Sequence, residues 1–124
     1  GLPVVAGGRS AGARVACRTA GDLGAAAVLT LAFPLHPPGR PEKSRADELT
    51  GAAKELPLLG VQGGADPFGR PEEFPAGHVP VEVPSADHGF AVPKRADITQ
   101  EAALAVITRA VAEWLNALGY ADAP

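Results

Sequence analysis

The chain has 124 residues, enough for one domain at most, and a formal net charge of −3. Hydrophobic residues make up 46% of it and charged residues 20%, which is a globular rather than a disordered composition. The acidic balance argues against a nucleic-acid or anionic-membrane partner, and the single cysteine excludes an internal disulfide framework or a cysteine-rich zinc site. No signal peptide opens the chain and no apolar run approaches the ~18 residues that would span a bilayer, so we expect a cytoplasmic protein.

Apolar runs predict four strands, which are distributed along the chain at Pro3–Gly7, Ala26–Phe33, Leu56–Gln62 and Val79–Pro84. The second and third runs are almost continuously apolar, as in strands that are buried on both faces. The fourth run alternates and places Val79, Val81 and Val83 on one face. Its two prolines cannot donate to a neighbouring strand, so this run predicts an edge strand.

Helical patterns fill the intervals between these runs. Residues Ala11–Thr19 predict a helix that ends near Gly21. A weaker helix is predicted over Ser44–Lys54, and a single turn over Pro71–Phe74.

The last helix has the clearest pattern. Asp97 and Gln100 resemble a capping box at its start, and Gly119 is expected to end it. The residues expected to face the core recur at spacings of three and four, namely Leu104, Ile107, Val111, Trp114 and Leu118.

Strands and helices therefore alternate, which is typical of an α/β fold with a parallel sheet covered by helices on both faces. Four strands are few for such a sheet. The chain also begins inside an apolar run and contains no methionine. These features favour a truncated domain that lacks its N-terminal part, and removal of an initiator methionine before Gly1 is the alternative.

The segment Gly8-Arg9-Ser10-Ala11-Gly12 has the pattern G-x-S-x-G, between the first predicted strand and the first predicted helix. In that context the serine occupies a strained turn, and the flanking glycines let strand and helix approach closely. Its hydroxyl is then presented at the C-terminal edge of the sheet, at the start of a helix whose dipole favours a developing negative charge. Ser10 is the predicted nucleophile, and the alternative is a glycine-rich turn with an idle serine.

A serine nucleophile needs a base and an acid that orients this base. Both are expected after later strands, in the chain order serine, acid, histidine. Asp66 follows the third predicted strand and His88 follows the fourth, so they fit as acid and base. The alternatives are a turn-forming role for Asp66 and a hydrogen bond within its loop for His88.

Other polar residues fit these roles less well. His36 precedes the acid, and we expect it to be structural or to lie at the substrate rim. His78 precedes its strand, at the opposite end of the sheet. Asp87 adjoins the predicted base and is expected to cap the loop backbone. Arg9 is placed to reach an anionic group of a substrate, and Cys17 is expected to pack behind the turn.

Four segments carry a resemblance to a known family: Gly8–Gly12 with Arg14, Phe33–Glu42, Val61–Gly69 and Asp87–Phe90. They resemble the dienelactone-hydrolase-like α/β-hydrolases. They are most similar to a branch of small hydrolase-like proteins that includes a testis-expressed protein and a scaffold subunit of the NSL histone acetyltransferase complex. The resemblance covers essentially the whole chain, but only the C-terminal part of that family's domain.

This resemblance implies one partial α/β-hydrolase domain over residues 1–124, with about four parallel strands, that begins at the strand before the nucleophile. It also implies that Ser10, Asp66 and His88 form the catalytic triad. The position of Ser10 holds cysteine in true dienelactone hydrolases, so lactone specificity is not implied. With the motif, the resemblance predicts a serine hydrolase that acts on a small ester or acyl substrate.

In the expected reaction the Ala11 amide forms half of the oxyanion hole, and Arg9 and His36 are candidates for substrate contacts. The second oxyanion donor comes from an upstream loop in such folds, so we expect the chain by itself to be a feeble catalyst. No metal and no cofactor are expected. The alternatives are a scaffold or interaction module with an idle triad, and an inactive fragment of a larger hydrolase.

The predicted strand over residues 3–7 would have one unpaired edge if nothing precedes it. Such an edge favours pairing with another chain. Pairing of chains through this strand is therefore expected, as a homodimer or as an aggregate.

Overall fold

The structure is a computed structural model and describes residues 2–120. Gly1 and residues 121–124 of the predicted domain lie outside the described part. The elements follow the chain in the order β1 (Val5–Arg9), α1 (Ala11–Thr19), β2 (Ala27–Leu31), α2 (Ala46–Glu55), β3 (Leu58–Gly63), a 3-10 turn η1 (Pro71–Glu73), β4 (Val81–Val83) and α3 (Gln100–Ala117).

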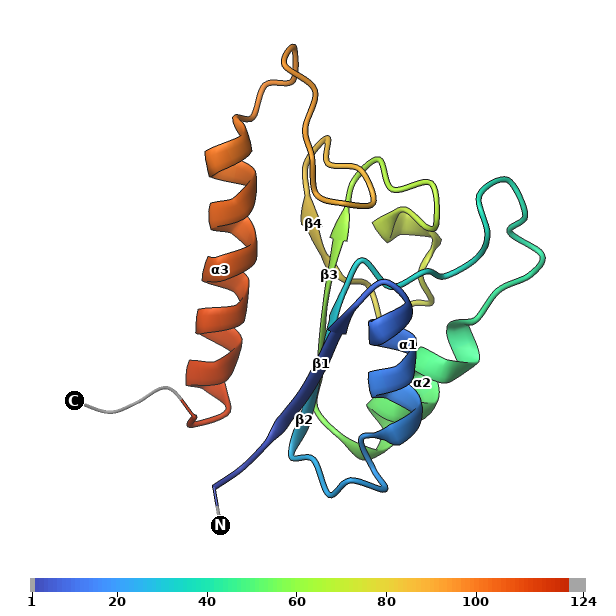
Figure 1. Cartoon of the computed structure of the whole chain (residues 1–124), viewed down its shortest axis with the longest axis vertical. Coiled ribbons are helices and arrows are strands. Elements are labelled where there is room, and N and C mark those ends of the chain that lie inside the picture. The colour runs from blue at the N-terminus through green and yellow to red at the C-terminus, as the bar shows by residue number, and fades with distance from the viewer. Residues whose placement is uncertain (1, 121–124) are drawn as a thin grey trace.

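The four strands form one parallel sheet in the order β1-β2-β3-β4, so strands that are consecutive in the chain are neighbours in space. Helices α1 and α2 cover one face of this sheet, and α3 covers the other (Figure 1). Strand β4 lies at an edge, where the missing amides of Pro80 and Pro84 interrupt no ladder. The predicted α/β fold with parallel strands and helices on both faces is confirmed.

The core has two layers, one on each face of the sheet. Below α1 and α2, Val28 and Phe33 pack with Leu49 and with small residues of α1. On the other face, Val61 and Val83 pack against Ala103 of α3. Each strand of the sheet interior therefore contributes apolar side chains to a helix layer, which is why the central runs of the sequence are almost continuously apolar.

The sequence locates the strands to within about two residues. Strand β1 begins and ends two residues later than the predicted Pro3–Gly7, because the last residues before the turn still pair with the end of β2. Strand β2 ends before Ala32, whose φ of 54° is incompatible with an extended chain. Helix α1 has the predicted bounds, and α2 begins two residues after Ser44, whose hydroxyl accepts a hydrogen bond from its first amide at 3.1 Å.

The capping box predicted for the start of α3, formed by Asp97 and Gln100, is wrong. The N-cap residue is Thr99, whose Oγ1 accepts a hydrogen bond from the Ala102 amide at 3.0 Å. Asp97 lies two residues too early for this position. The Gln100 side chain turns away from the helix start and bonds the backbone of the preceding loop at 2.8 and 3.1 Å.

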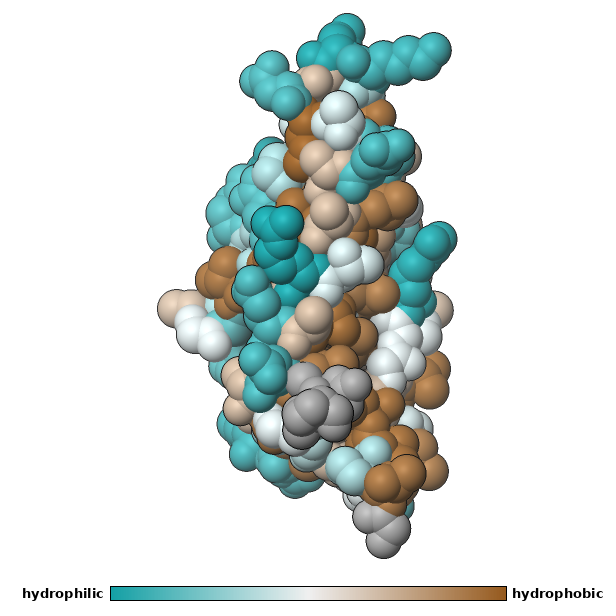
Figure 2. Space-filling view, turned by 90° about the vertical axis from the view of Figure 1, so that its left-hand side faces the viewer, coloured by the Kyte–Doolittle hydropathy of each residue, from teal (hydrophilic) through white to brown (hydrophobic). Residues whose placement is uncertain are grey.

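The buried face of α3 differs from the prediction at Leu104 only. Ile107 packs against the core as predicted, and the other predicted positions are half-buried, namely Val111, Trp114 and Leu118. Leu104 is 49% exposed, whereas Ala103 is fully buried and Val106 and Ala110 pack behind it. The small side chain of Ala103 lets the first turns of the helix approach the sheet, which rotates Leu104 outward. The view of the α3 side in Figure 2 accordingly shows apolar surface exposed among polar groups.

Within residues 2–120, no helix combines the length and the apolar character needed to cross a membrane. The cytoplasmic location stays a prediction.

Candidate active site

Ser10 is the one residue between β1 and α1, and it forms the turn between them. Its φ of 56° and ψ of −122° are unusual for a residue with a side chain, and its amide donates to the Leu31 carbonyl at 2.9 Å. A Cβ added to Gly8 would lie 2.8 Å from the Ala13 nitrogen and still closer to the Gly12 carbonyl. Glycine at this position is therefore required for strand and helix to pass so closely.

Gly12 does not share this requirement. A Cβ added there would meet no described atom within 4 Å. The prediction that close approach needs glycine on both sides of Ser10 is thus confirmed for Gly8 only.

The three residues of the predicted triad come together, although Ser10 and His88 are 78 positions apart. Ser10 Oγ lies 2.8 Å from His88 Nε2, and His88 Nδ1 lies 2.9 and 3.1 Å from the two carboxylate oxygens of Asp66. They meet because the strands are parallel, so the segments after β1, β3 and β4 leave the sheet at the same edge.

This geometry fixes the tautomer of a neutral His88. The carboxylate of Asp66 can only accept, so Nδ1 carries the proton and donates to it. Nε2 is then the acceptor, and the Ser10 hydroxyl donates its hydrogen to it. The imidazole thus presents a lone pair to the serine proton, which is the arrangement that a general base needs.

Asp66 is fully buried and has further donors on both of its carboxylate oxygens. The Phe68 amide donates to Oδ1 at 2.8 Å, and the Gln62 side-chain amide donates to Oδ2 at 3.2 Å. These contacts fix the plane of the carboxylate and offset the cost of burying its charge.

Gln62 is a site residue for which sequence reasoning assigned no role. It is 1% exposed in β3, and its side chain also bonds the Phe33 backbone at 2.9 and 3.0 Å and the Gly69 carbonyl at 2.9 Å. The side chain therefore joins the end of β2, the Asp66 loop and the carboxylate. A lone amide within an apolar, buried strand is the signal that could have identified it.

Phe68 is a second residue to which the sequence reasoning gave no role. Its ring centroid lies 4.2 Å from that of His88, with 30° between the two planes. An aromatic residue two positions after an acid carries no distinctive sequence signal, and only the fold brings the two rings together.

His36 is buried, and both of its ring nitrogens have protein partners. Nδ1 lies 2.8 Å from the Pro37 carbonyl, and Nε2 lies 2.8 Å from a carboxylate oxygen of Glu73. The hydrogen bond to Pro37 and the nearby Glu73 raise the pKa of His36 although burial opposes this. The hydrogen bond from the Arg70 amide, followed by the contact with His36, lowers the pKa of Glu73. This arrangement fits the structural alternative for His36, and a substrate contact stays a prediction.

The remaining candidates fall into separate environments. Oδ1 of Asp87 accepts from the amides of Gly89 and Ala91, both at 2.9 Å, which confirms its capping role. Cys17 packs behind the turn as predicted, and burial raises the pKa of its thiol to about 11. Arg9 is exposed, and its contact with a substrate stays a prediction.

The amide of Ala11 is the first of α1, where a helical N–H has no acceptor within its own helix. It directly follows the nucleophile candidate, at the positive end of the helix dipole. Its role in an oxyanion hole stays a prediction.

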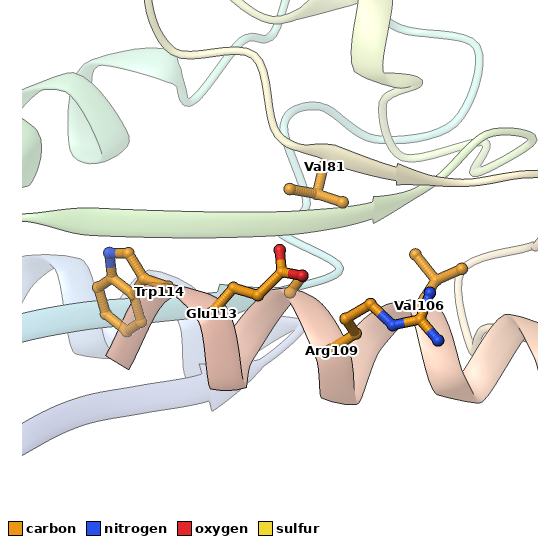
Figure 3. Close-up of a pocket in the computed structure, with 6 residues that line it drawn as sticks. Val81, Val106, Arg109, Glu113 and Trp114 are labelled. Carbon is orange, nitrogen blue, oxygen red and sulfur yellow. The ribbon is translucent and has the colours of Figure 1, made fainter. Parts of the chain in front are cut away.

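Among the cavities of the described residues, one lies beside the triad and another lies away from it. One of about 360 Å³ adjoins Asp66 on the side of His36 and Arg70. Another, of about 460 Å³, separates the start of β4 from the second half of α3 and is lined in part by Val81 and Trp114 (Figure 3). It includes none of the triad residues. Within residues 2–120, no group of three or more His, Cys, Asp or Glu side chains could hold a metal ion.

Comparison of the chain with curated proteins and with solved structures found no significant match. A family model described as an alpha/beta hydrolase domain matches residues 1–116. This range contains all four strands, the turn at Ser10, the loops that carry Asp66 and His88, and nearly all of α3. The chain therefore belongs to the alpha/beta hydrolase family.

Proposed function

We propose that the chain is a serine hydrolase that cleaves esters or other acyl compounds with Ser10, His88 and Asp66. The observation that carries this proposal is the continuous line of contacts from Ser10 Oγ through His88 to Asp66, at 2.8 and 2.9 Å. Membership in the alpha/beta hydrolase family supports it.

In the first half of the proposed reaction, Ser10 Oγ attacks the carbonyl carbon of the substrate while His88 Nε2 accepts the hydroxyl proton. The carbonyl oxygen becomes an oxyanion, to which the Ala11 amide donates at the N-terminus of α1. Asp66 keeps the imidazole in its orientation and stabilises the imidazolium as it forms. His88 then gives the proton to the departing alcohol or other leaving group, and the acyl group remains on Ser10.

In the second half, His88 accepts a proton from water, and the resulting nucleophile attacks the acyl-serine. Collapse of the tetrahedral intermediate returns the proton to Ser10 and releases the acid. His88 is 24% exposed, so water has access to the base from one side.

Within the family, we propose that the chain is related to the dienelactone-hydrolase-like group. The segments that carry this resemblance surround the site, because Gln62, Asp66 and Phe68 lie in one of them and His36 in another. The contacts of these residues give each segment a function in holding the triad, which supports the relation.

Labelling with a fluorophosphonate probe tests the proposal. The wild-type chain is expected to be labelled on one serine, and Ser10→Ala to abolish the label. Ser44→Ala and Ser85→Ala are matched controls, since both serines are exposed and lie outside the triad. Asp66→Asn is expected to slow labelling on the order of 10³–10⁴-fold, because a neutral amide no longer selects the required tautomer.

Two results would contradict the proposal. One is a wild-type chain that folds and stays unlabelled, which would favour a module with an idle triad. The other is labelling that persists in Ser10→Ala.

A further inference from the structure

Phe68 contacts the predicted acid and base at the same time. Its ring stacks on the imidazole of His88 with 4.2 Å between centroids, and its amide donates to Oδ1 of Asp66 at 2.8 Å. Its carbonyl accepts from the amide of His36 at 3.0 Å. One residue thus joins two members of the triad to a third segment of the chain.

The two hydrogen bonds of His88 leave its orientation incompletely fixed. Nδ1 donates one of them to Asp66, and Nε2 accepts the other from Ser10. Rotation of the ring plane about the line between these partners changes either distance only slightly. A flat neighbour against the face of the imidazole opposes this rotation, and the Phe68 ring occupies that place at an angle of 30°.

An aromatic face has a second effect when the base becomes charged. The face of a benzene ring is electron-rich, and it attracts a cation that lies over it within about 6 Å. His88 acquires a positive charge when it accepts the Ser10 proton. A phenylalanine ring stacked on it favours this charged form, whereas an aliphatic side chain of similar size does not.

The ring of Phe68 is itself held in place by its loop. His36 binds the Phe68 carbonyl through its amide, while its side chain binds Glu73 of η1 at 2.8 Å. The next residue, Gly69, has a φ of 142° and packs against Leu35, where an added Cβ would lie 2.7 Å from the side chain. The segment that carries Phe68 is therefore fixed on both sides of the aromatic residue.

We propose that Phe68 is a positioning residue for the reaction, which fixes the plane of the His88 imidazole by stacking and stabilises the imidazolium. The proposal rests on the proposed function for its consequence in catalysis, but not for the stacking itself. Phe68 acts through His88.

The test compares Phe68→Leu with Phe68→Tyr, which keeps the aromatic face. Both variants retain the backbone contacts of residue 68 with Asp66 and His36. Phe74→Leu is the matched control, because it removes a phenylalanine that packs edge-on against Phe33, away from the imidazole. The first measurement is the rate of fluorophosphonate labelling. The second is the NMR resonance of the His88 Nδ1 proton, which needs no activity.

Phe68→Leu is expected to slow labelling by about two- to fivefold. It should also broaden the Nδ1 proton resonance, because the imidazole plane then fluctuates and the angle of the hydrogen bond from Nδ1 to Asp66 varies. Phe68→Tyr is expected to restore the rate and the resonance, and Phe74→Leu to leave both as in the wild type. A general loss of stability would affect the control in the same way as Phe68→Leu.

A folded Phe68→Leu protein that keeps both the labelling rate and the resonance of the wild type would overturn the inference and leave the proposed function intact. If the wild type resists labelling, the function fails, and the resonance alone decides whether Phe68 positions His88. If Phe68→Leu does not fold, the NMR spectrum of the wild type tests the stacking instead. Ring protons of His88 without the upfield shift that a stacked ring causes would overturn the proposal, and shifted ones would support it.

Discussion

His36 is a buried histidine whose two ring nitrogens both face oxygen atoms that can only accept a hydrogen bond. The Pro37 carbonyl and the Glu73 carboxylate each lie 2.8 Å away, so these contacts favour the imidazolium form, in which both nitrogens donate. These same contacts raise the pKa of His36, and the pKa of Glu73 is lowered. The pair links the loop after β2 to η1, and the amide of His36 also donates to the Phe68 carbonyl in the segment that carries Asp66.

The stability from this pair depends on pH with a definite sign. Because folding raises the pKa of His36, the contribution of His36 to stability is complete at pH values below its ordinary pKa of 6.5. This contribution is lost as pH rises through the raised pKa. Because folding lowers the pKa of Glu73, the contribution of Glu73 to stability is complete at pH values above its ordinary pKa of 4.5. This contribution is lost as pH falls through the lowered pKa. Both contributions are therefore complete between these two ordinary values.

Glu73→Gln is expected to reduce the free energy of unfolding most within this pH window. The loss should shrink at alkaline pH, where His36 is neutral in the folded chain. Chemical denaturation at several pH values measures the difference between variant and wild type. Glu72→Gln is the matched control, since that carboxylate is 65% exposed and lies 3.8 Å from Arg70. A loss with Glu73→Gln that is constant from pH 5 to pH 9 would show that His36 carries no charge.

At the scale of elements, the contact between β1 and α1 depends on one glycine. A Cβ on Gly8 would lie within 2.8 Å of the Ala13 backbone and against that of Gly12. Neither group can move by itself, because both belong to the backbone of the first turn of α1. A Cβ on Gly12 would point into open space among the described residues.

Gly8→Ala is expected to destabilise the chain by about 1–3 kcal/mol, because it forces strand and helix apart. Gly12→Ala, the matched control, is expected to change stability little or to raise it by up to about 1 kcal/mol, since alanine favours the helical conformation. The free energy of unfolding in denaturant measures both. Equal effects of the two substitutions would contradict the close approach at Gly8.

Local sequence patterns predicted the type and order of the elements, but only approximately their ends. Helix α1 could be placed because the motif before it and Gly21 shortly after it mark both limits. The start of α3 could not, since Asp97 and Thr99 are both good N-cap residues and the choice depends on where the loop from β4 delivers the chain. The first position of the buried stripe of α3 could not be placed either, because alanine at residue 103 gives a weak hydrophobic signal.

The candidate triad was predictable for a different reason. One motif places Ser10 after a strand, and the rule that parallel strands share a C-terminal edge then selects Asp66 and His88. The supporting residues follow no such rule. Gln62 bonds the Phe33 backbone across 29 positions, and Phe68 stacks on a ring 20 positions away, so neither partnership is visible in a local pattern.

At the scale of the whole molecule, one edge of the sheet is open among the residues that the structure describes. Strand β1 pairs with β2 alone. The Val4 carbonyl accepts from Ala26 at 2.8 Å and the Ser10 amide donates to Leu31 at 2.9 Å, so the even-numbered residues of β1 face β2. The backbone groups of Val5, Gly7 and Arg9 then face outward, because successive residues of a strand alternate.

Such an edge favours pairing with a second copy of the chain, and β1 has few of the features that discourage it. The side chains of β1 carry one charge, at Arg9. Val4, which directly precedes the strand, is 63% exposed. Apolar surface also gathers toward the lower end of the molecule in Figure 2. We therefore expect two chains to associate through their β1 edges.

Sedimentation velocity over a range of concentrations should show a reversible dimer of the 124-residue chain. Val5→Pro is expected to weaken the dimer, because it removes an outward amide while the even-numbered residues still pair with β2. Val4→Lys should weaken it through repulsion between the two copies. Leu23→Lys is the matched control, since Leu23 is 75% exposed in the turn between α1 and β2. A monomer at all concentrations, or equal effects of Val4→Lys and Leu23→Lys, would show that the β1 edge does not pair.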